Sequence, residues 1–302
     1  MASSAGARHG GKDIASDDVA TETAKGRARP DTMRILLWVA VVLIMLFCLF
    51  PFYWLINTSL KTGQDLSRAS LLPPSPSLDN FTSVFNNGDF TDALKSSVII
   101  SFSVTILSLV IGSFAGYALA RLRFPRKFLL LSIVLSISTF PPIAIAAPVF
   151  KLWTDLGLYN TYLGLILPSM AFGLPLTVFI LTSFFKEIPK ELEEAALVDG
   201  ATYFQAFRKV IVPLAAPGLV TAGLLTFIYA WNEFLFAITL ASDPKVRPVP
   251  AAIADFTGST EFEVPLGTIS AASVVVTVPL IVLVLVFQRR IVAGMTAGAV
   301  KG

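Results

Sequence analysis

The sequence has little charge, one cysteine and one histidine. Only 14% of its 302 residues are Asp, Glu, Lys or Arg, whereas a soluble domain carries about 25%. Together with a hydrophobic content of 55%, this argues against an ordinary soluble protein and indicates an integral membrane protein. The net charge of +3 is too small to indicate nucleic acid as a partner.

The chain also lacks the residue sets that catalysis and metal binding need. Cys48, alone in an apolar run, has no partner for an internal disulfide. His9 lies in a polar tail without other metal-ligating residues. The sequence contains no Gly-x-x-x-x-Gly-Lys-Ser/Thr loop and no Ser/His/Asp set. We therefore expect no catalytic residue, no cofactor and no metal in this chain.

What the sequence does have is long apolar stretches. A helix needs about 20 mostly apolar residues to cross the hydrocarbon core of a bilayer. Six stretches meet this length, and they predict an all-α membrane protein with six transmembrane helices at residues 35–56, 97–119, 128–150, 162–185, 214–240 and 266–287.

The ends of the chain differ from this apolar body. Residues 1–33 are rich in small and charged residues, which predicts a disordered tail. The first apolar stretch is too long for a typical signal peptide and should stay uncleaved. The predicted organisation is a tail at 1–33, a membrane domain at 34–288 and a second tail at 289–302.

Basic residues set the expected orientation, because Lys and Arg in flanks and short loops accumulate on the cytoplasmic side. With both termini in the cytoplasm, 17 of the 23 basic residues fall inside. Segments 57–96, 151–161 and 241–265 then face outward. Segments 121–127 and 186–213 face inward.

The inward segment 186–213 has the pattern of two short helices. Pro189 and the acidic residues that follow it suit a helix start. Gly200 suits the end of that helix. Thr202 and Gln205 have the spacing of a capping box, which predicts a second helix over 203–211. Leu192, Ala195 and Ala196 are expected to share one face, which either docks on a partner or lies on the membrane surface.

The same segment resembles a known signature. Glu194-Ala195-Ala196-x-x-x-Gly200, followed after nine residues by Val210-Ile211-Val212-Pro213, resembles the signature loop of ABC importer permeases. The family has Ile-x-Leu-Pro where this chain has two valines, which is a conservative departure. The loop also stands where the family has it, before the last two spans.

The C-terminus is similar to that of the carbohydrate branch of this family. Residues 288–302, QRRIVAGMTAGAVKG, resemble the second permease of maltose-type importers and are close to actinobacterial trehalose importer permeases. The resemblance implies that this tail contacts the ATPase subunits through Gln288, Gly294, Thr296, Gly298 and Lys301.

The resemblance implies a type I ABC importer permease fold in a bacterial plasma membrane. Its expected partners are a second homologous permease, two ATPase subunits that bind ATP and Mg, and an extracytoplasmic solute-binding protein that delivers a sugar and touches the outer segment 241–265. The residues expected to couple to the ATPase are Glu194, Ala195, Ala196, Asp199, Gly200 and Pro213. The sugar is expected to be a di- or oligosaccharide such as trehalose or maltose.

Polar residues inside the apolar stretches are candidates for the sugar path. Glu233 is the one ionisable residue placed inside a predicted span, and such charges are costly. Asn232 and Glu233 could hydrogen-bond a sugar, and Trp231 could stack on it. The alternative is that Glu233 braces a neighbouring helix or reaches outward. Pro141-Pro142 and Gly173-Leu174-Pro175 mark kinks that serve either a gate or packing only.

Three other functions are compatible with the long apolar stretches. An ion-coupled secondary sugar transporter would need no ATPase, but such carriers usually hold several buried titratable groups. A channel or scaffold subunit leaves segment 186–213 and the tail without a role. A membrane enzyme lacks its catalytic residues here.

Overall fold

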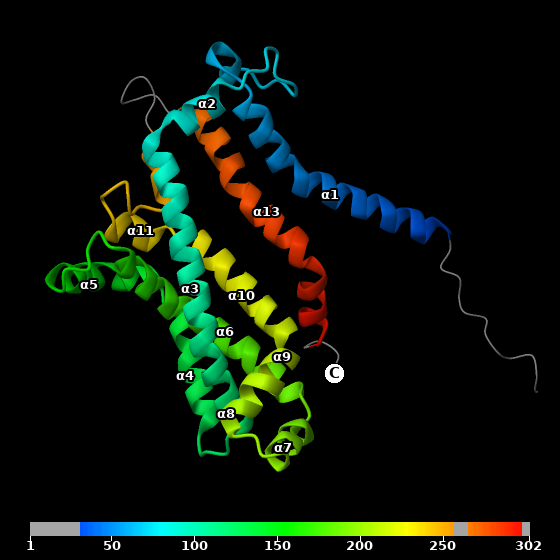
Figure 1. Ribbon diagram of the computed structural model, residues 1–302. Helices are drawn as coiled ribbons and strands as arrows, with labels where there is room; N and C mark the ends of the chain where they lie inside the picture. Colours follow the sequence, from blue (N-terminus) through cyan, green and yellow to red (C-terminus); the bar gives the residue numbers. More distant parts are fainter. Residues whose placement is uncertain (1–30, 257–264, 298–302) are drawn as a thin grey trace, which may run out of the picture. The chain divides into compact units, whose positions relative to one another are not determined.

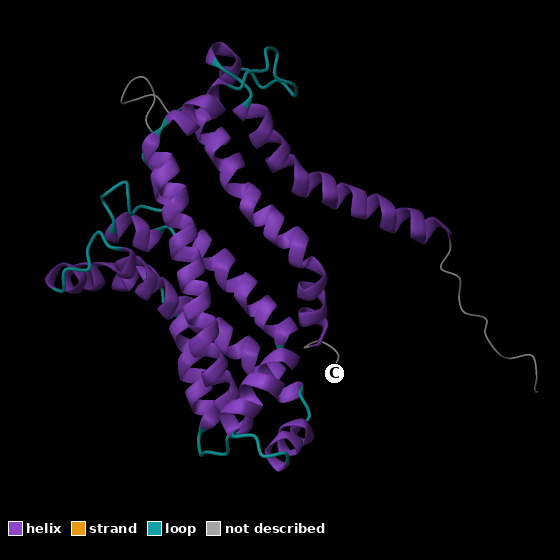
Figure 2. Ribbon diagram, in the orientation of Figure 1, coloured by secondary structure: helices purple, strands orange, loops and turns teal. Residues whose placement is uncertain are grey.

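The computed structural model describes residues 31–256 and 265–297, with side chains as far as Gln288. Across these residues the regular structure is helical, and no strand is present in this part of the chain (Figure 2). The chain divides into two units, Met1–Phe52 and Tyr53–Gly302, which are described separately. The described part of the first unit belongs to α1 (Asp31–Ser59), a long apolar helix that continues into the second unit.

The second unit is a bundle of long helices joined by short ones (Figure 1). Its elements in chain order are a 3-10 turn η1 (Gly63–Ser67), α2 (Asp79–Asn86), α3 (Gly88–Arg121), α4 (Lys127–Thr139), α5 (Pro142–Asp155), α6 (Tyr162–Glu187), α7 (Lys190–Val198), α8 (Tyr203–Ala206), a π-helical turn η2 (Phe207–Ile211), α9 (Val212–Leu214), α10 (Ala216–Trp231), α11 (Leu235–Leu240), α12 (Val249–Ala254) and α13 (Leu266–Ala297).

Helices α3, α6 and α10 form the centre of this unit. Small residues let α3 and α6 approach closely, as the Gly112-x-x-x-Gly116 spacing predicts. A Cβ added at Gly112 would lie 2.7 Å from the Thr177 Cγ2, and one at Gly116 would lie 3.1 Å from the Thr182 backbone nitrogen. Between α6 and α10, the hydroxyls of Thr177 and Thr226 are hydrogen-bonded at 2.7 Å.

Four of the six predicted spans are continuous helices, namely α1, α3, α6 and α13. The third prediction is wrong as a single helix: α4 ends at Thr139, α5 begins at Pro142, and the two are bent by 87°. Pro142 has no N–H to donate and Pro141 holds Phe140 in extended backbone, so the helix cannot continue there.

The fifth prediction, residues 214–240, is also wrong as a single helix. Its main helix α10 begins at Ala216 and ends at Trp231, and a separate short helix α11 begins at Leu235. At its other end α10 is bent by 75° from the helices at Tyr203–Leu214. Helix α6, in contrast, continues without a break from Tyr162 to Glu187, although it contains Pro168 and Pro175.

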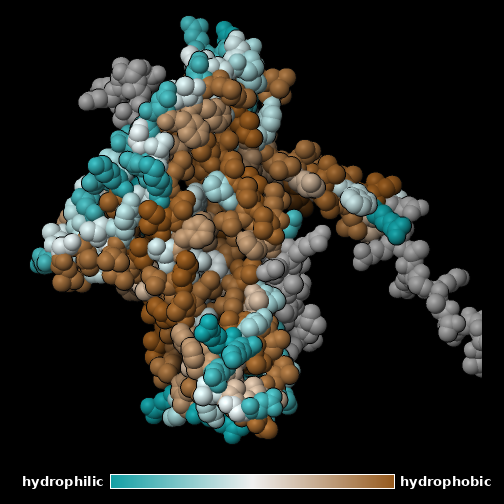
Figure 3. Space-filling model, viewed as in Figure 1, coloured by the Kyte–Doolittle hydropathy of each residue, from teal (hydrophilic) through white to brown (hydrophobic). Residues whose placement is uncertain are grey.

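The surface of the second unit fits a bilayer environment. Figure 3 shows apolar residues over much of the visible length of the bundle, and hydrophilic residues gathered at the end that carries α7 and α8. The chain is therefore a multi-pass membrane protein. Its described residues contain four continuous helices that are long and apolar enough to cross a bilayer, or six such spans if each bent helix pair counts as one.

The close approach of α3 to α6 yields a packing prediction. Replacing Gly116→Ala puts a methyl group against the α6 backbone and should lower the free energy of unfolding by about 1–3 kcal/mol. The matched change Gly88→Ala, on the same helix with no atom within 4 Å of the new Cβ, should leave stability nearly unchanged. Thermal denaturation in detergent measures both, and equal midpoints for the two variants would contradict the packing argument.

Candidate functional site

The segment between α6 and α10 folds as a helix–turn–helix at the end of the bundle opposite α2 (Figure 1). The first helix, α7, ends in a Schellman motif. The Gly200 N–H donates to the Leu197 carbonyl at 3.1 Å, and the Ala201 N–H donates to the Ala196 carbonyl at 3.0 Å. Gly200 has φ +87°, a left-handed conformation that glycine adopts without steric cost. The predicted helix end is thus confirmed.

The second helix begins with the predicted capping box. The Gln205 N–H donates to the Thr202 hydroxyl at 3.2 Å, and the Thr202 N–H donates to the Gln205 side-chain oxygen at 2.9 Å. The helix then continues through the π-helical turn to Leu214, so it runs three residues beyond the predicted end. Pro213 lies exposed in its last turn.

One face of α7 is attached to the membrane bundle by a buried ion pair. The Glu193 Oε2 lies 3.4 Å from the Arg121 Nε at the end of α3, and the two side chains are only 11% and 5% exposed. The Tyr117 hydroxyl donates to the other Glu193 oxygen. Arg121 also donates from Nη2 to the Ile188 carbonyl at 2.7 Å. These contacts hold both the start of α7 and the end of α6 against α3.

The second short helix is attached through an aromatic cluster. The Phe207 ring, buried at 6% exposure, lies 4.9 Å from the Tyr117 ring and 5.3 Å from the Phe114 ring, measured between centroids. The Phe185 ring of α6 completes the cluster at 6.3 Å from Phe207. Such packed aromatic pairs stabilise beyond the burial of their area, so the turn is fixed to α3 and α6.

The opposite face of the helix pair is free. Val198, Tyr203 and Phe204 are 87%, 69% and 58% exposed. Glu194, Ala195, Asp199 and Gly200 are exposed beside them, and Ala196 is half-buried. The structure thus brings the expected coupling residues of α7 to one open surface, while Pro213 lies at the far end of the second helix.

The face of α7 that was predicted to dock on a partner or to lie on the membrane surface is open in the structure. Leu192 and Ala195 are exposed and Ala196 is half-buried, and the residue of α7 that the chain itself buries is Glu193. Arg121 and Tyr117 were also missed as partners. The sequence offers no local signal for them, because their contact with Glu193 joins segments more than seventy residues apart. In the sequence, Arg121 at the end of a predicted span is indistinguishable from the Lys and Arg residues that set membrane orientation.

The candidate sugar-path residues lie where α10 ends. Trp231 is buried at 2% exposure and its ring stacks on Phe227 at 5.5 Å, so it is not open for stacking on a sugar here. Glu233 accepts hydrogen bonds from the backbone N–H groups of Phe236 at 2.8 Å and Ala237 at 3.1 Å. This geometry favours the alternative that Glu233 braces a neighbouring helix, here α11. Asn232 is exposed and donates to the Ile228 carbonyl at 2.7 Å.

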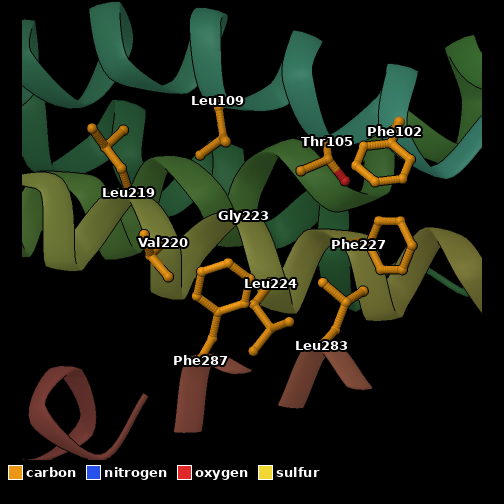
Figure 4. Close-up of a pocket in the computed structure, with 10 residues that line it drawn as sticks. All are labelled: Phe102, Thr105, Leu109, Leu219, Val220, Gly223, Leu224, Phe227, Leu283 and Phe287. Atoms are coloured by element: carbon orange, nitrogen blue, oxygen red, sulfur yellow. The ribbon is translucent and has the colours of Figure 1, made fainter. Parts of the chain in front are cut away.

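A hollow of about 260 Å³ lies between α3, α10 and α13 (Figure 4). The hydroxyl of Thr105 in its wall donates to the Ser101 carbonyl at 2.6 Å, so it is already engaged within α3. An otherwise apolar wall suits hydrocarbon and not a sugar, which needs several polar partners. The lining residues are Phe102, Thr105, Leu109, Leu219, Val220, Gly223, Leu224, Phe227, Leu283 and Phe287.

The segment after α11, which was predicted to face outward, is fixed to the bundle by polar contacts. Asn160, which precedes α6, accepts hydrogen bonds at Oδ1 from the N–H groups of Ser242 at 2.5 Å and Asp243 at 3.1 Å. The Lys245 carbonyl accepts from the hydroxyls of Ser96 at 2.8 Å and Tyr162 at 3.0 Å. The segment therefore holds a defined position above the start of α6.

The predicted C-terminal contacts are only partly described. Helix α13 continues to Ala297, so Gly294 and Thr296 lie on a helical backbone. Gln288 is exposed and donates to the Leu285 carbonyl at 3.1 Å. Gly298 and Lys301 lie outside the described residues. Among residues 31–256 and 265–297, no group of three or more metal-ligating side chains is found.

The attachment of α7 predicts unequal roles for two adjacent glutamates. Glu193→Ala leaves Arg121 buried without its partner, and removal of one member of a buried ion pair costs about 3–5 kcal/mol. Glu194→Ala changes an exposed side chain and should alter stability by less than about 0.5 kcal/mol. Thermal unfolding of the purified chain compares them, and a larger loss for Glu194→Ala would reverse the assignment.

Comparison with known proteins supplies the family. Over 260 residues the chain is 48% identical to the trehalose transport system permease protein SugB of Mycobacterium tuberculosis, covering 86% of this chain and 95% of that protein. It is 41% identical to the trehalose/maltose transport system permease protein MalG of Thermococcus litoralis, covering 89% and 97%.

The fold is found in solved transporters as well. A chain from the crystal structure of a bacterial ABC transporter involved in import of the polysaccharide alginate matches with a TM-score of 0.73 at 24% identity, over 86% of this chain and 96% of that one. The model of the family described as binding-protein-dependent transport system inner membrane component matches residues 108–297. The chain thus belongs to the family of inner membrane components of binding-protein-dependent transport systems.

Proposed function

We propose that this chain is the permease subunit of an ATP-driven importer for a sugar. It forms the translocation path with a second homologous permease, and it couples to the ATPase subunits through segment 186–213. The observation that carries the proposal is the helix pair α7–α8, which is fixed to the bundle on one face by Glu193 and Phe207. Its other face is open and exposes the apolar side chains of Val198, Tyr203 and Phe204 beside the charged Glu194 and Asp199.

The open face has the chemistry of a protein-docking surface. Val198, Tyr203 and Phe204 expose apolar area, and removal of such area from water favours association with a partner. The small side chain of Ala195 lets another backbone come close. The carboxylate of Glu194 is free to pair with a basic group of the ATPase. The turn after α7 is shaped by Asp199 and Gly200, and the end of the second helix is shaped by Pro213. The tail from Gln288 to Lys301 adds a second ATPase contact.

Transport follows from alternating access by rigid-body motion. ATP and Mg, bound by the ATPase subunits, close those subunits and displace the docked helix pair. The permease pair then turns outward to receive sugar from a solute-binding protein that touches segment 241–265. The names of the similar permeases point to trehalose or maltose, and hence to an α-linked di- or oligosaccharide, as the substrate.

The proposed orientation in the bacterial plasma membrane has both termini in the cytoplasm. It rests on 17 of 23 basic residues falling inside, and it puts the α7–α8 surface on the side where ATP is available. The rival of an ion-coupled carrier is disfavoured because both carboxylate oxygens of Glu233 are engaged with backbone N–H groups.

The direct test is reconstitution in lipid with the neighbouring permease, ATPase and binding protein. ATP hydrolysis and sugar uptake are measured with trehalose, maltose and a panel of other sugars. Stimulation by one sugar-loaded binding protein identifies the substrate. Uptake by this chain alone, without an ATPase, would establish the carrier function instead.

The docking surface gives a matched glycine comparison. Gly200 and Gly157 have φ of +87° and +70°, and neither has an atom within 4 Å of an added Cβ. Replacing either by alanine should cost about 1–2 kcal/mol of stability through the left-handed conformation. Gly200→Ala should in addition weaken ATPase binding by at least about tenfold, because the new methyl stands in the packed interface.

Co-purification of the ATPase with each variant measures this difference, and Glu194→Lys should weaken binding as Gly200→Ala does. Equal ATPase recovery with Gly200→Ala and Gly157→Ala would show that the turn is not a docking surface.

A further inference from the structure

We propose that α3 is the mechanical link between the ATPase-facing helix pair and the outward segment 245–249, and that Tyr117, Arg121 and Ser97 are the positioning residues of this link. The inference rests on the proposed function for the role of the two surfaces. It assigns to three side chains a part in coupling that the docking surface itself does not explain.

At the inner end, buried side chains connect α7 directly to α3, in addition to the contacts of α7 with the short helices that follow it in the chain. Chain continuity leads from α7 through the π-helical turn and a 75° bend into α10. The buried contacts of Glu193 provide a second and more direct route, because they join α7 to Arg121 and Tyr117 on α3. A displacement of α7 therefore acts on α3 through a short charged contact that is shielded from water.

At the outer end, two adjacent serines of α3 hold the outward segment. The Ser96 hydroxyl donates to the Lys245 carbonyl at 2.8 Å. The Ser97 hydroxyl accepts from the Val249 N–H at 2.8 Å, at the start of α12. Ser96, Ser97 and Val249 are 0%, 1% and 0% exposed, so these hydrogen bonds do not exchange with water.

Between the two ends α3 is an unbroken helix of 34 residues. At 1.5 Å per residue, about 36 Å separates Ser97 from Arg121. Proline is the usual cause of a kink, and of the four continuous spans in the described residues only α3 contains none. The others hold Pro51, Pro168 with Pro175, and Pro279. A continuous helix that is attached at both ends couples the positions of those ends.

Such a link makes the coupling between the two surfaces reciprocal. Binding protein acting on the outer segment changes the position of α7, and ATPase closure at α7 changes the outer segment. Weakening either end should reduce this coupling while leaving the α7–α8 surface, and hence ATPase docking, in place.

The experiment removes one hydroxyl at each end of α3. Tyr117→Phe keeps the ring in its aromatic cluster but loses the hydrogen bond to Glu193, and Ser97→Ala loses the bond to Val249. Thr91→Ala is the matched control, because the Thr91 hydroxyl bonds the Gly88 carbonyl of its own helix. In the reconstituted complex, ATP hydrolysis is measured with and without binding protein loaded with trehalose, or with the sugar that the panel identifies.

Each of the two variants should lower the ratio of stimulated to basal hydrolysis by about two- to thirtyfold, the range of coupling energies of about 0.5–2 kcal/mol. Basal hydrolysis and the control should stay unchanged. Because both contacts serve one link, the double variant should lower the ratio of stimulated to basal hydrolysis no further than the more impaired single variant does. Fold-changes that multiply, or unchanged ratios in a complex that binding protein stimulates, would overturn the proposal.

A second measurement does not depend on transport. Amide hydrogen exchange of the assembled complex reports local opening. Tyr117→Phe should raise exchange in residues 190–198 and also in residues 245–249, and Ser97→Ala should do the same from the other end. If exchange rises only beside each substitution, α3 is not a link between the two ends. This outcome can be read even when binding protein does not stimulate the native complex, that is, even when the proposed function has failed.

Discussion

The hydrocarbon core of the bilayer holds no water that could pair with backbone N–H and C=O groups, and this constraint shapes the whole molecule. Every N–H and C=O in the hydrocarbon must be paired inside the protein, so each break in a span needs local compensation. At the break after Trp231, the Glu233 carboxylate accepts from the N–H groups of Phe236 and Ala237 and so begins a new helix. At the break before α5, Pro142 brings no N–H that needs a partner. At both breaks the number of unpaired backbone N–H groups is reduced, in one case by an accepting side chain and in the other by a proline that has no N–H.

The same constraint leaves the short helices outside the spans free to serve partners. Helices α7 and α8 are too short to be stable alone in water, and they exist because the bundle holds them. Buried charge in Glu193 and Arg121 fixes the position, while the aromatic cluster around Phe207 supplies apolar burial. A buried ion pair is a poor source of stability compared with hydrocarbon. It does define one geometry, and so fixes how α7 is held against the bundle.

Local features of this architecture could be predicted from sequence, and long-range ones could not. Gly200 and the Thr202–Gln205 pair act on their own neighbours, so their spacing alone predicted the turn and the second helix start. The Pro141-Pro142 pair predicted a kink, but no local rule gives an 87° bend. Residues 232–234 were included in a span because apolar residues flank them on both sides. The Arg121–Glu193 contact depends on how α3 and α6 pack, and sequence periodicity carries no record of that.

The two adjacent glutamates of α7 have a consequence for how such transporters diversify. Glu193 faces the membrane bundle and Glu194 faces outward, so one helix carries two independent sets of requirements on alternate sides. Substitutions on the outward side alter the exposed surface without disturbing the contacts that hold α7 to the membrane bundle. If that surface docks the ATPase, as proposed, a permease built this way can be adapted to a different motor by changing a handful of outward residues.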